Sequence, residues 1–210
     1  MAQRTKKVKR PTAPLSGRIV DDTIALAEEV GWDNVRLRMV AGRLGITLTE
    51  IGEHYRDLDA VADAWFGRAR AAMLAPVDTE FSTLPTRERI RWLMMRWFDA
   101  LAPHREVTVQ MLMAKMWPVH VHHWVPMIFN LSRTILWLRD AAGLDAGGVR
   151  RQIEEIGLTN LFLAALCVWA RDDTEGQERT RRFLTRQLAM ADMLMATAFS
   201  RRRPRADAGT

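Results

Sequence analysis

The chain has 210 residues, 48% of them hydrophobic, and a single cysteine, Cys167. This length allows a substantial core, in one medium domain or in a small domain joined to a larger one. One cysteine excludes an intramolecular disulfide framework, and the absence of a charge-free apolar run of about 18 residues argues against a membrane-spanning helix. The N-terminal sequence MAQRTKKVKRP lacks the apolar stretch of a secretory signal. We therefore expect a cytoplasmic protein.

The net charge of +6 is carried by the two ends of the chain. Residues 1–18 hold six bases and no acid, and residues 201–210 hold four bases and one acid, so that 21 bases and 24 acids remain between them. The central part is thus slightly acidic, and attraction for a polyanion would come from the ends. Two interpretations of the ends stay open: solvated tails, or arms that contact the DNA minor groove or a membrane surface.

Helical spacing of apolar residues predicts three short helices in the first third of the chain. The first spans RIVDDTIALAEEV and ends at Gly31, because glycine tolerates the left-handed conformation that follows a helix. The second covers residues 35–44 and is followed by a turn at Gly45. Thr47 then caps a third helix, and Glu50 completes a capping box. The residues predicted to face inward are Ile19, Thr23, Leu26, Ala27, Val30, Leu37, Val40, Ala41, Leu44, Leu48, Ile51 and Tyr55.

A fourth helix is predicted over residues 58–73 with Asp57 as its cap, followed by the linker APVDTEFSTLPT. Residues 86–140 are rich in tryptophan and methionine, and three prolines divide them into several helices. The last two helices are predicted at about 149–171 and 175–203. No alternating strand pattern of useful length occurs, so the predicted fold class is all-α.

The first 65 residues resemble the head of the TetR family of regulators. The matching segments are RIVDDTIALAEEVGW, VRLRMVAGRLGIT and IGEHYRDLDAV. The resemblance implies an N-terminal three-helix helix-turn-helix head, whose last helix enters the DNA major groove, and a C-terminal helical bundle for ligand binding and dimerisation. The implied boundaries are a flexible basic arm at 1–17, the head at 18–66, the ligand-binding and dimerisation domain at 67–203 and a disordered tail at 204–210.

The head departs from the family pattern in its recognition helix and in its charge. Gly52 stands where a phosphate-contacting tyrosine is common, and Leu58 replaces a lysine. Residues 19–66 hold ten acids and four bases, and a net charge of −6 disfavours phosphate binding. Glu50 is occupied by its capping box, while Glu53 can accept a hydrogen bond from a cytosine amino group. The candidate DNA-binding residues are Arg36, Arg38, Arg43, Thr47, Thr49, Glu50, Glu53, His54, Tyr55 and Arg56.

The tryptophans and methionines after residue 86 have two interpretations, ordinary core or the wall of an adaptable apolar pocket. The TetR resemblance implies a ligand cavity in this region. The candidate ligand-binding residues are Trp92, Met95, Met113, Trp117, Trp124, Met127, Phe129 and Phe162, with His120 or Asn160 as polar contacts.

The sequence contains no pattern that indicates catalysis. His120 and His123 lie one helical turn apart in WPVHVHHW, but no confident third ligand accompanies them, so no metal site is predicted. No phosphate-binding glycine loop and no nucleophile motif occurs. We expect neither enzymatic activity nor a cofactor.

Apolar and small residues at helical spacing in the last two helices predict a two-fold homodimer through a four-helix bundle. The predicted interface residues are Ile153, Ile156, Gly157, Asn160, Leu161, Ala164, Leu184, Leu188, Ala191, Met195 and Ala198.

Two functions follow from these observations. The first is a dimeric TetR-type repressor that binds a palindromic operator in double-stranded DNA and responds to an apolar small molecule. The second rests on RWFDALAPHRE and VWARDDTEGQERTRRFLTRQLAMADML, which are similar to the C-terminal region of the TetR-fold accessory protein of ubiquinone biosynthesis. That resemblance implies binding of a lipid or isoprenoid, contact with a membrane surface, and a head that does not read DNA.

Overall fold

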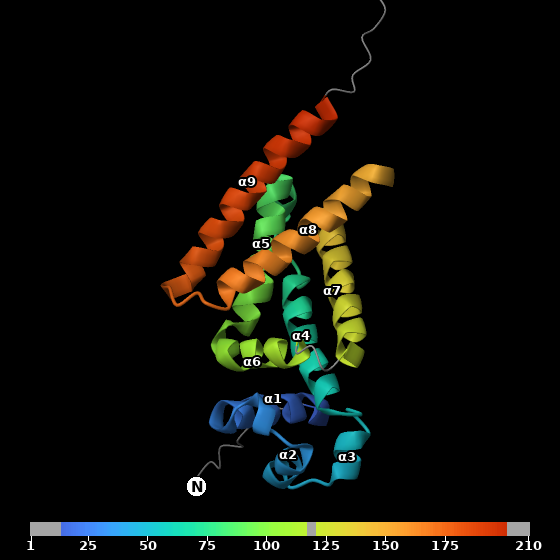
Figure 1. Cartoon of the computed structure of the whole chain (residues 1–210), viewed down its shortest axis with the longest axis vertical. Coiled ribbons are helices and arrows are strands. Elements are labelled where there is room, and N and C mark those ends of the chain that lie inside the picture. Colours follow the sequence, from blue (N-terminus) through green and yellow to red (C-terminus); the bar gives the residue numbers. More distant parts are fainter. Residues whose placement is uncertain (1–13, 117–120, 201–210) are drawn as a thin grey trace, which may run out of the picture. The chain divides into compact units, whose positions relative to one another are not determined.

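The computed structural model describes residues 14–116 and 121–200, with side chains at 14–115 and 130–197. All secondary-structure elements in these ranges are helices (Figure 1). The all-α prediction is confirmed. None of the described helices is long and apolar enough to cross a membrane. With η for a 3-10 helix, the elements are α1 (Leu15–Val30), η1 (Trp32–Asn34), α2 (Leu37–Leu44), α3 (Leu48–Gly52), α4 (Leu58–Met73), η2 (Thr79–Thr83), α5 (Thr86–Leu101), η3 (Ala102–His104), α6 (Arg105–Met116), α7 (Val121–Ala141), α8 (Gly148–Trp169), η4 (Glu175–Gln177) and α9 (Glu178–Ser200).

The chain divides into two compact units, Met1–Phe66 and Gly67–Thr210, and the division falls inside α4. In the first unit, α2 packs against both α1 and α3. In the second unit, α9 packs against α5 and α8, and α7 packs against α5, α6 and α8. Each unit therefore has its own set of helix contacts and its own core.

The core of the first unit is formed by the predicted inner faces of α1, α2 and α3. Ile19, Val40 and Ile51 are fully buried. Thr23 is buried as well, because its hydroxyl donates a 2.6 Å hydrogen bond to the Ile19 carbonyl within the helix. A threonine can thus occupy this inner face without an unsatisfied polar group.

Two residues predicted to face inward are exposed. Val30, the last residue of α1, is 36% exposed. Leu48 is 55% exposed because it is the first residue of α3, a helix of only five residues that turns a single apolar side chain, Ile51, into the core. The predicted inward orientation was wrong for both.

Most predicted helix ends are confirmed. Gly31 and Gly45 follow α1 and α2 with φ angles of +81° and +67°. The Asp57 carboxylate accepts a 2.7 Å hydrogen bond from the Ala60 N–H and caps α4. α1, in contrast, begins at Leu15, earlier than the arm boundary at residue 17 implies, because Pro14 precedes it in an extended conformation and a proline leaves no unpaired N–H at a helix start.

Aromatic rings from α5 and α8 form the centre of the second unit. The Phe98 ring lies 5.7 Å from the Phe162 ring and 5.6 Å from the Trp169 ring, and Trp97 meets Phe162 edge-on at 4.9 Å. Such pairs each add about 0.5–1.5 kcal/mol beyond the burial of their area. The cluster anchors one face of α8, and its opposite face lies away from this core (Figure 1).

The connection between α8 and α9 is organised by Asp172, a fully buried carboxylate. Asp172 accepts hydrogen bonds from the N–H and hydroxyl groups of both Thr174 and Thr180. Burial alone would raise the pKa of Asp172, but these hydrogen bonds outweigh it and lower the pKa to about 2. The ionised carboxylate therefore stabilises the start of α9.

Asp172→Asn is expected to lower the free energy of unfolding by about 2 kcal/mol, because a pKa displaced from 3.8 to about 2 corresponds to that contribution. The amide would also turn an NH₂ group toward groups that donate. Since the folded-state pKa is lowered, this contribution is complete above pH 3.8 and is lost as the pH falls toward 2. Urea unfolding at pH 7 and at pH 3 measures both effects. Asp173→Asn removes only an exposed carboxylate 3.0 Å from Arg179 and should change little.

Candidate nucleic-acid interface and effector region

The turn between α2 and α3 has the geometry of a helix-turn-helix motif. Gly45 adopts the left-handed conformation after α2, and the Ile46 N–H donates a 3.0 Å hydrogen bond back to the Ala41 carbonyl. The chain then enters α3 at Thr47, whose hydroxyl accepts a 3.2 Å hydrogen bond from the Glu50 N–H. The Glu50 carboxylate in turn accepts 2.8 Å hydrogen bonds from the Thr47 N–H and hydroxyl. The predicted capping box is confirmed.

The capping box engages the Glu50 carboxylate at the surface of the head. This carboxylate is held at the start of α3 by Thr47, and the backbone and side-chain hydrogen bonds from Thr47 lower the pKa of Glu50. The negative charge also faces the partial positive charge of the helix start, where it is favourable. Of the two glutamates in this helix region, only Glu53 is free of such a capping role.

Thr47→Ala is expected to destabilise α3 by about 1 kcal/mol, because the helix loses its cap and the Glu50 carboxylate loses one donor. Hydrogen exchange at the α3 amides should accelerate about fivefold if it reports local opening. Thr49→Ala removes the same hydroxyl from an exposed position two residues later, where it caps nothing. Equal effects of the two substitutions would contradict the capping role.

The outward face of the α3 region is mostly polar and carries one exposed acid. The exposed residues are Leu48, Thr49, Gly52, Glu53 and His54. A Cβ at Gly52 would meet nothing within 4 Å, so this position is open to larger side chains. Tyr55 is only partly exposed, and its hydroxyl donates a 3.1 Å hydrogen bond to the Ser16 carbonyl in α1. Its side chain is therefore directed toward α1.

Three of the four arginines in residues 19–66 are engaged within the head. Arg43 pairs with Glu29 at 2.7 Å and Asp22 at 3.5 Å. Arg36 donates two 2.7 Å hydrogen bonds to backbone carbonyls, and Arg56 pairs with its neighbour Asp57 at 3.0 Å. Arg38 is exposed and makes no ion pair with any described residue. Sequence position alone does not distinguish these four side chains.

The candidate ligand-wall residues lie in different environments. Met95 and Phe162 are 2% and 3% exposed and belong to the core of the second unit, whereas Met113 is 56% exposed. Asn160 lies on the exposed side of α8. Trp117 and His120 lie outside the described residues, as do the side chains of Trp124, Met127 and Phe129.

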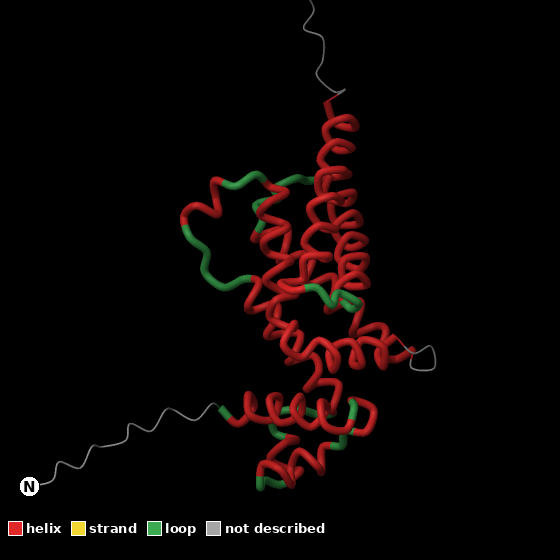
Figure 2. Tube along the Cα trace, turned by 90° about the vertical axis from the view of Figure 1, so that its left-hand side faces the viewer, coloured by secondary structure: helices red, strands yellow, loops and turns green. Residues whose placement is uncertain are grey.

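Trp92 holds the linker between α4 and α5, the long connection on one side of the second unit in Figure 2. Its ring lies 5.0 Å from that of Phe81 in η2, and the Arg96 guanidinium lies 4.5 Å above it. Arg96 also donates a 2.9 Å hydrogen bond to the Ala75 carbonyl at the start of the linker. Sequence analysis missed this role, although Arg96 one turn after Trp92 was a visible signal.

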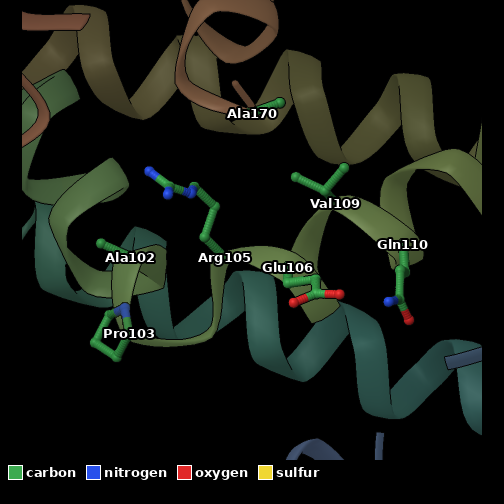
Figure 3. Close-up of a pocket in the computed structure, with 7 residues that line it drawn as sticks. All are labelled: Ala102, Pro103, Arg105, Glu106, Val109, Gln110 and Ala170. Atoms are coloured by element: carbon green, nitrogen blue, oxygen red, sulfur yellow. The ribbon is translucent and has the colours of Figure 1, made fainter. Parts of the chain in front are cut away.

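A pocket of 530 Å³ lies where η3, α6 and the end of α8 meet. Figure 3 shows Arg105, Glu106 and Gln110 among its lining side chains, the first two at the start of α6 and Gln110 one turn later. The remaining lining residues are Ala102, Pro103, Val109 and Ala170. This open, partly polar pocket contains none of the predicted wall residues and differs in chemistry from the expected apolar cavity.

A solved structure of the TetR transcriptional regulator from Nitrosomonas europaea ATCC 19718 is 40% identical to this chain, covers 86% of it and 99% of that protein, and superposes with a TM-score of 0.76. The chain belongs to the TetR family of transcriptional regulators. Two Rhodococcus structures share the TetR fold: a protein of unknown function (19% identity, 88% and 98% coverage, TM-score 0.52) and a tetR-family regulatory protein (14% identity, 85% and 97% coverage, TM-score 0.50). No protein-family model and no curated protein matches.

The exposed apolar surface of this TetR-family chain differs from the predicted interface in α9. Leu184 and Leu188 are 0% and 5% exposed, because they pack inside the second unit, so their assignment to an interface was wrong. Among the described side chains of α9, the large apolar residues that are exposed are instead Met190, Met193 and Leu194, at 52%, 67% and 67%. In α8, Ile153 and Ile156 are 45% and 63% exposed, as an interface would require.

The described part of this TetR-family chain holds no group of three or more His, Cys, Asp or Glu residues that could bind a metal ion. His120 lies outside the described residues, and so does the side chain of His123. The expectation that the histidine pair binds no metal therefore stays a prediction.

Proposed function

We propose that this TetR-family regulator is a homodimeric repressor that binds a palindromic operator through α3 and leaves DNA when an apolar small molecule binds its C-terminal unit. The observation that carries the proposal is the capped helix-turn-helix with an exposed α3 face, in a chain 40% identical to a TetR regulator. Thr49, Glu53 and His54 would read base edges, and Arg38 would contact a phosphate.

The attraction for DNA is assigned mainly to the N-terminal bases. Residues 19–66 have a net charge of −6, and three of the four arginines among them are already engaged within the head. Non-specific affinity depends on the number of neutralised phosphates. Residues 1–18 carry six bases without an acid and can supply that charge.

Effector response requires that the ligand prefer one conformation of the dimer over the other, because equal affinity for both would shift nothing. The abundance of tryptophan and methionine in residues 86–140 supports an apolar ligand. Thermal unfolding in the presence of medium- and long-chain fatty acids and of isoprenoid alcohols tests this choice. A rise in the melting temperature with a matching loss of DNA binding supports the effector role, and no shift with any of them opposes it.

Glu53→Gln is expected to strengthen non-specific DNA binding and to relax sequence preference. The substitution removes an exposed negative charge from the α3 region and replaces a pure acceptor with an amide that also donates. Gel shifts on the operator and on variants of each C·G pair measure the change. Unaltered discrimination at every cytosine would exclude Glu53 as a base reader.

The second candidate function is binding of a lipid or isoprenoid at a membrane surface, without DNA recognition. The acidic head favours it because its negative charge disfavours contact with DNA phosphates. Selection of bound fragments from random genomic DNA separates the two. Recovery of a palindromic site supports the repressor. If no DNA is shifted at low salt while the protein pellets with anionic vesicles, the repressor proposal is wrong.

A further inference from the structure

The exposed side of α8 carries a continuous row of residues spaced alternately by four and three positions. Its members are Val149, Ile153, Ile156, Asn160, Leu163 and Cys167, all exposed. This spacing is that of the a and d positions of a heptad repeat, which packs against another helix. The inner side of α8, with Phe162 and Trp169, is occupied by the chain's own core. We call the exposed set the α8 row.

On the two sides of Asn160, a large residue on one side is matched by a smaller residue at the same distance on the other side. Seven residues away on either side stand Ile153 and Cys167, and four residues away stand Ile156 and Ala164. Three residues away, Leu163 is matched by Gly157, where a Cβ would meet nothing within 4 Å. An antiparallel copy centred on Asn160 would place Ile153, Ile156 and Leu163 each opposite a smaller residue, which permits close packing over the central part of the row.

The lack of charged residues in this part of α8 also favours a second copy of the chain as the partner of the α8 row. From Ile156 to Ala170 the sequence contains no Asp, Glu, Lys or Arg, so two copies meet without like-charge repulsion and without burying an ion. A strongly charged partner would find no ion-pair partner on this stretch. The Asn160 amide makes no hydrogen bond with described residues, and an amide facing its own copy can both donate and accept.

We propose that the two-fold axis of the dimer passes beside Asn160, whose amide pairs with the same residue of a second chain and fixes the register of α8 against α8. This inference rests on the proposed homodimer and adds its geometry. A single polar residue in an apolar seam specifies register, because any shifted pairing buries the amide against apolar groups. Asn160 is thus assigned to the interface that its helix spacing predicts, while its predicted contact with an effector stays a prediction.

Disulfide trapping of the full chain tests the register. Under mild oxidation, Asn160→Cys in a Cys167→Ser background should convert most of the protein to a covalent dimer, because equivalent Cβ atoms lie close together only near a two-fold axis. Ile153→Cys should form a disulfide with the native Cys167 of the second copy, and this cross-link should disappear when Cys167→Ser is added. The unaltered chain should stay uncross-linked, since Cys167 faces Ile153 of the second copy.

Native mass measurement before oxidation separates the two levels of the proposal. A monomer at micromolar concentration overturns the homodimer. If the protein is a dimer but Asn160→Cys/Cys167→Ser does not cross-link, the proposed register is wrong. This holds whether or not Ile156→Cys/Cys167→Ser cross-links instead. Cross-linking at 160, together with the Cys167 dependence of the Ile153→Cys link, supports it, because a non-specific contact would not show both.

Discussion

Deletion of residues 1–14 is expected to weaken DNA binding strongly and to flatten its dependence on salt. The segment carries five bases and no acid, while the head itself is acidic. Each lost phosphate contact lowers the slope of log affinity against log salt by about one unit, so the slope should fall by up to about five units. Fluorescence anisotropy with operator DNA at several salt concentrations measures both quantities.

Deletion of residues 204–210 is the matched control, because that segment holds one base and one acid and its removal leaves the net charge unchanged. Its salt slope should equal that of the full chain. A slope that stays the same after removal of residues 1–14 would show that the N-terminal bases do not contact DNA. In that case we expect the arm to act on anionic membranes, where each base near the surface contributes about 1 kcal/mol, and deletion of residues 1–14 should then reduce vesicle pelleting.

Ile156→Arg is expected to yield a monomer and to abolish tight operator binding. Ile156 is 63% exposed in the single chain, so arginine does not disturb its fold, but a two-fold interface would bury the new charge twice. An unpaired buried charge costs about 3 kcal/mol or more, which raises the dimer dissociation constant at least about 100-fold. Sedimentation and gel shifts on a full palindrome provide the measurement.

Val77→Arg is the control for this substitution, since Val77 is a 42% exposed apolar residue in the linker after α4. It should preserve both the dimer and the operator complex. If Ile156→Arg dimerises with unchanged affinity, α8 is not part of the interface. The proposed position of Asn160 at the two-fold axis would then be wrong as well.

The sequence predicted the elements whose signals are local. Gly31, Gly45 and the Thr47–Glu50 capping box each act within a few residues, and the structure confirms them. Leu184 and Leu188 were misassigned because periodicity shows that a helix has an apolar face, but not whether that face meets the same chain or another one.

The candidate site was predictable in outline and less so in its chemistry. The turn between α2 and α3 could be placed from its glycine and threonine. The engagement of Arg43 by Asp22 and Glu29 could not, because it depends on how α1 packs against α2. Trp92 was likewise placed in the tryptophan-rich region, but its contact with Phe81 requires the path of the linker.

The α3 region separates the residues that fold the head from those that face outward. Thr47, Glu50 and Ile51 stabilise the helix through its cap and its core contact. Thr49, Gly52 and Glu53 are exposed, and a side chain added at Gly52 would enter open space. Variation at these three positions therefore carries little penalty in stability, so that substitutions can accumulate there while the scaffold is retained. On the proposal that this face reads DNA, we expect a library randomised at positions 49, 52 and 53 to yield regulators with altered targets.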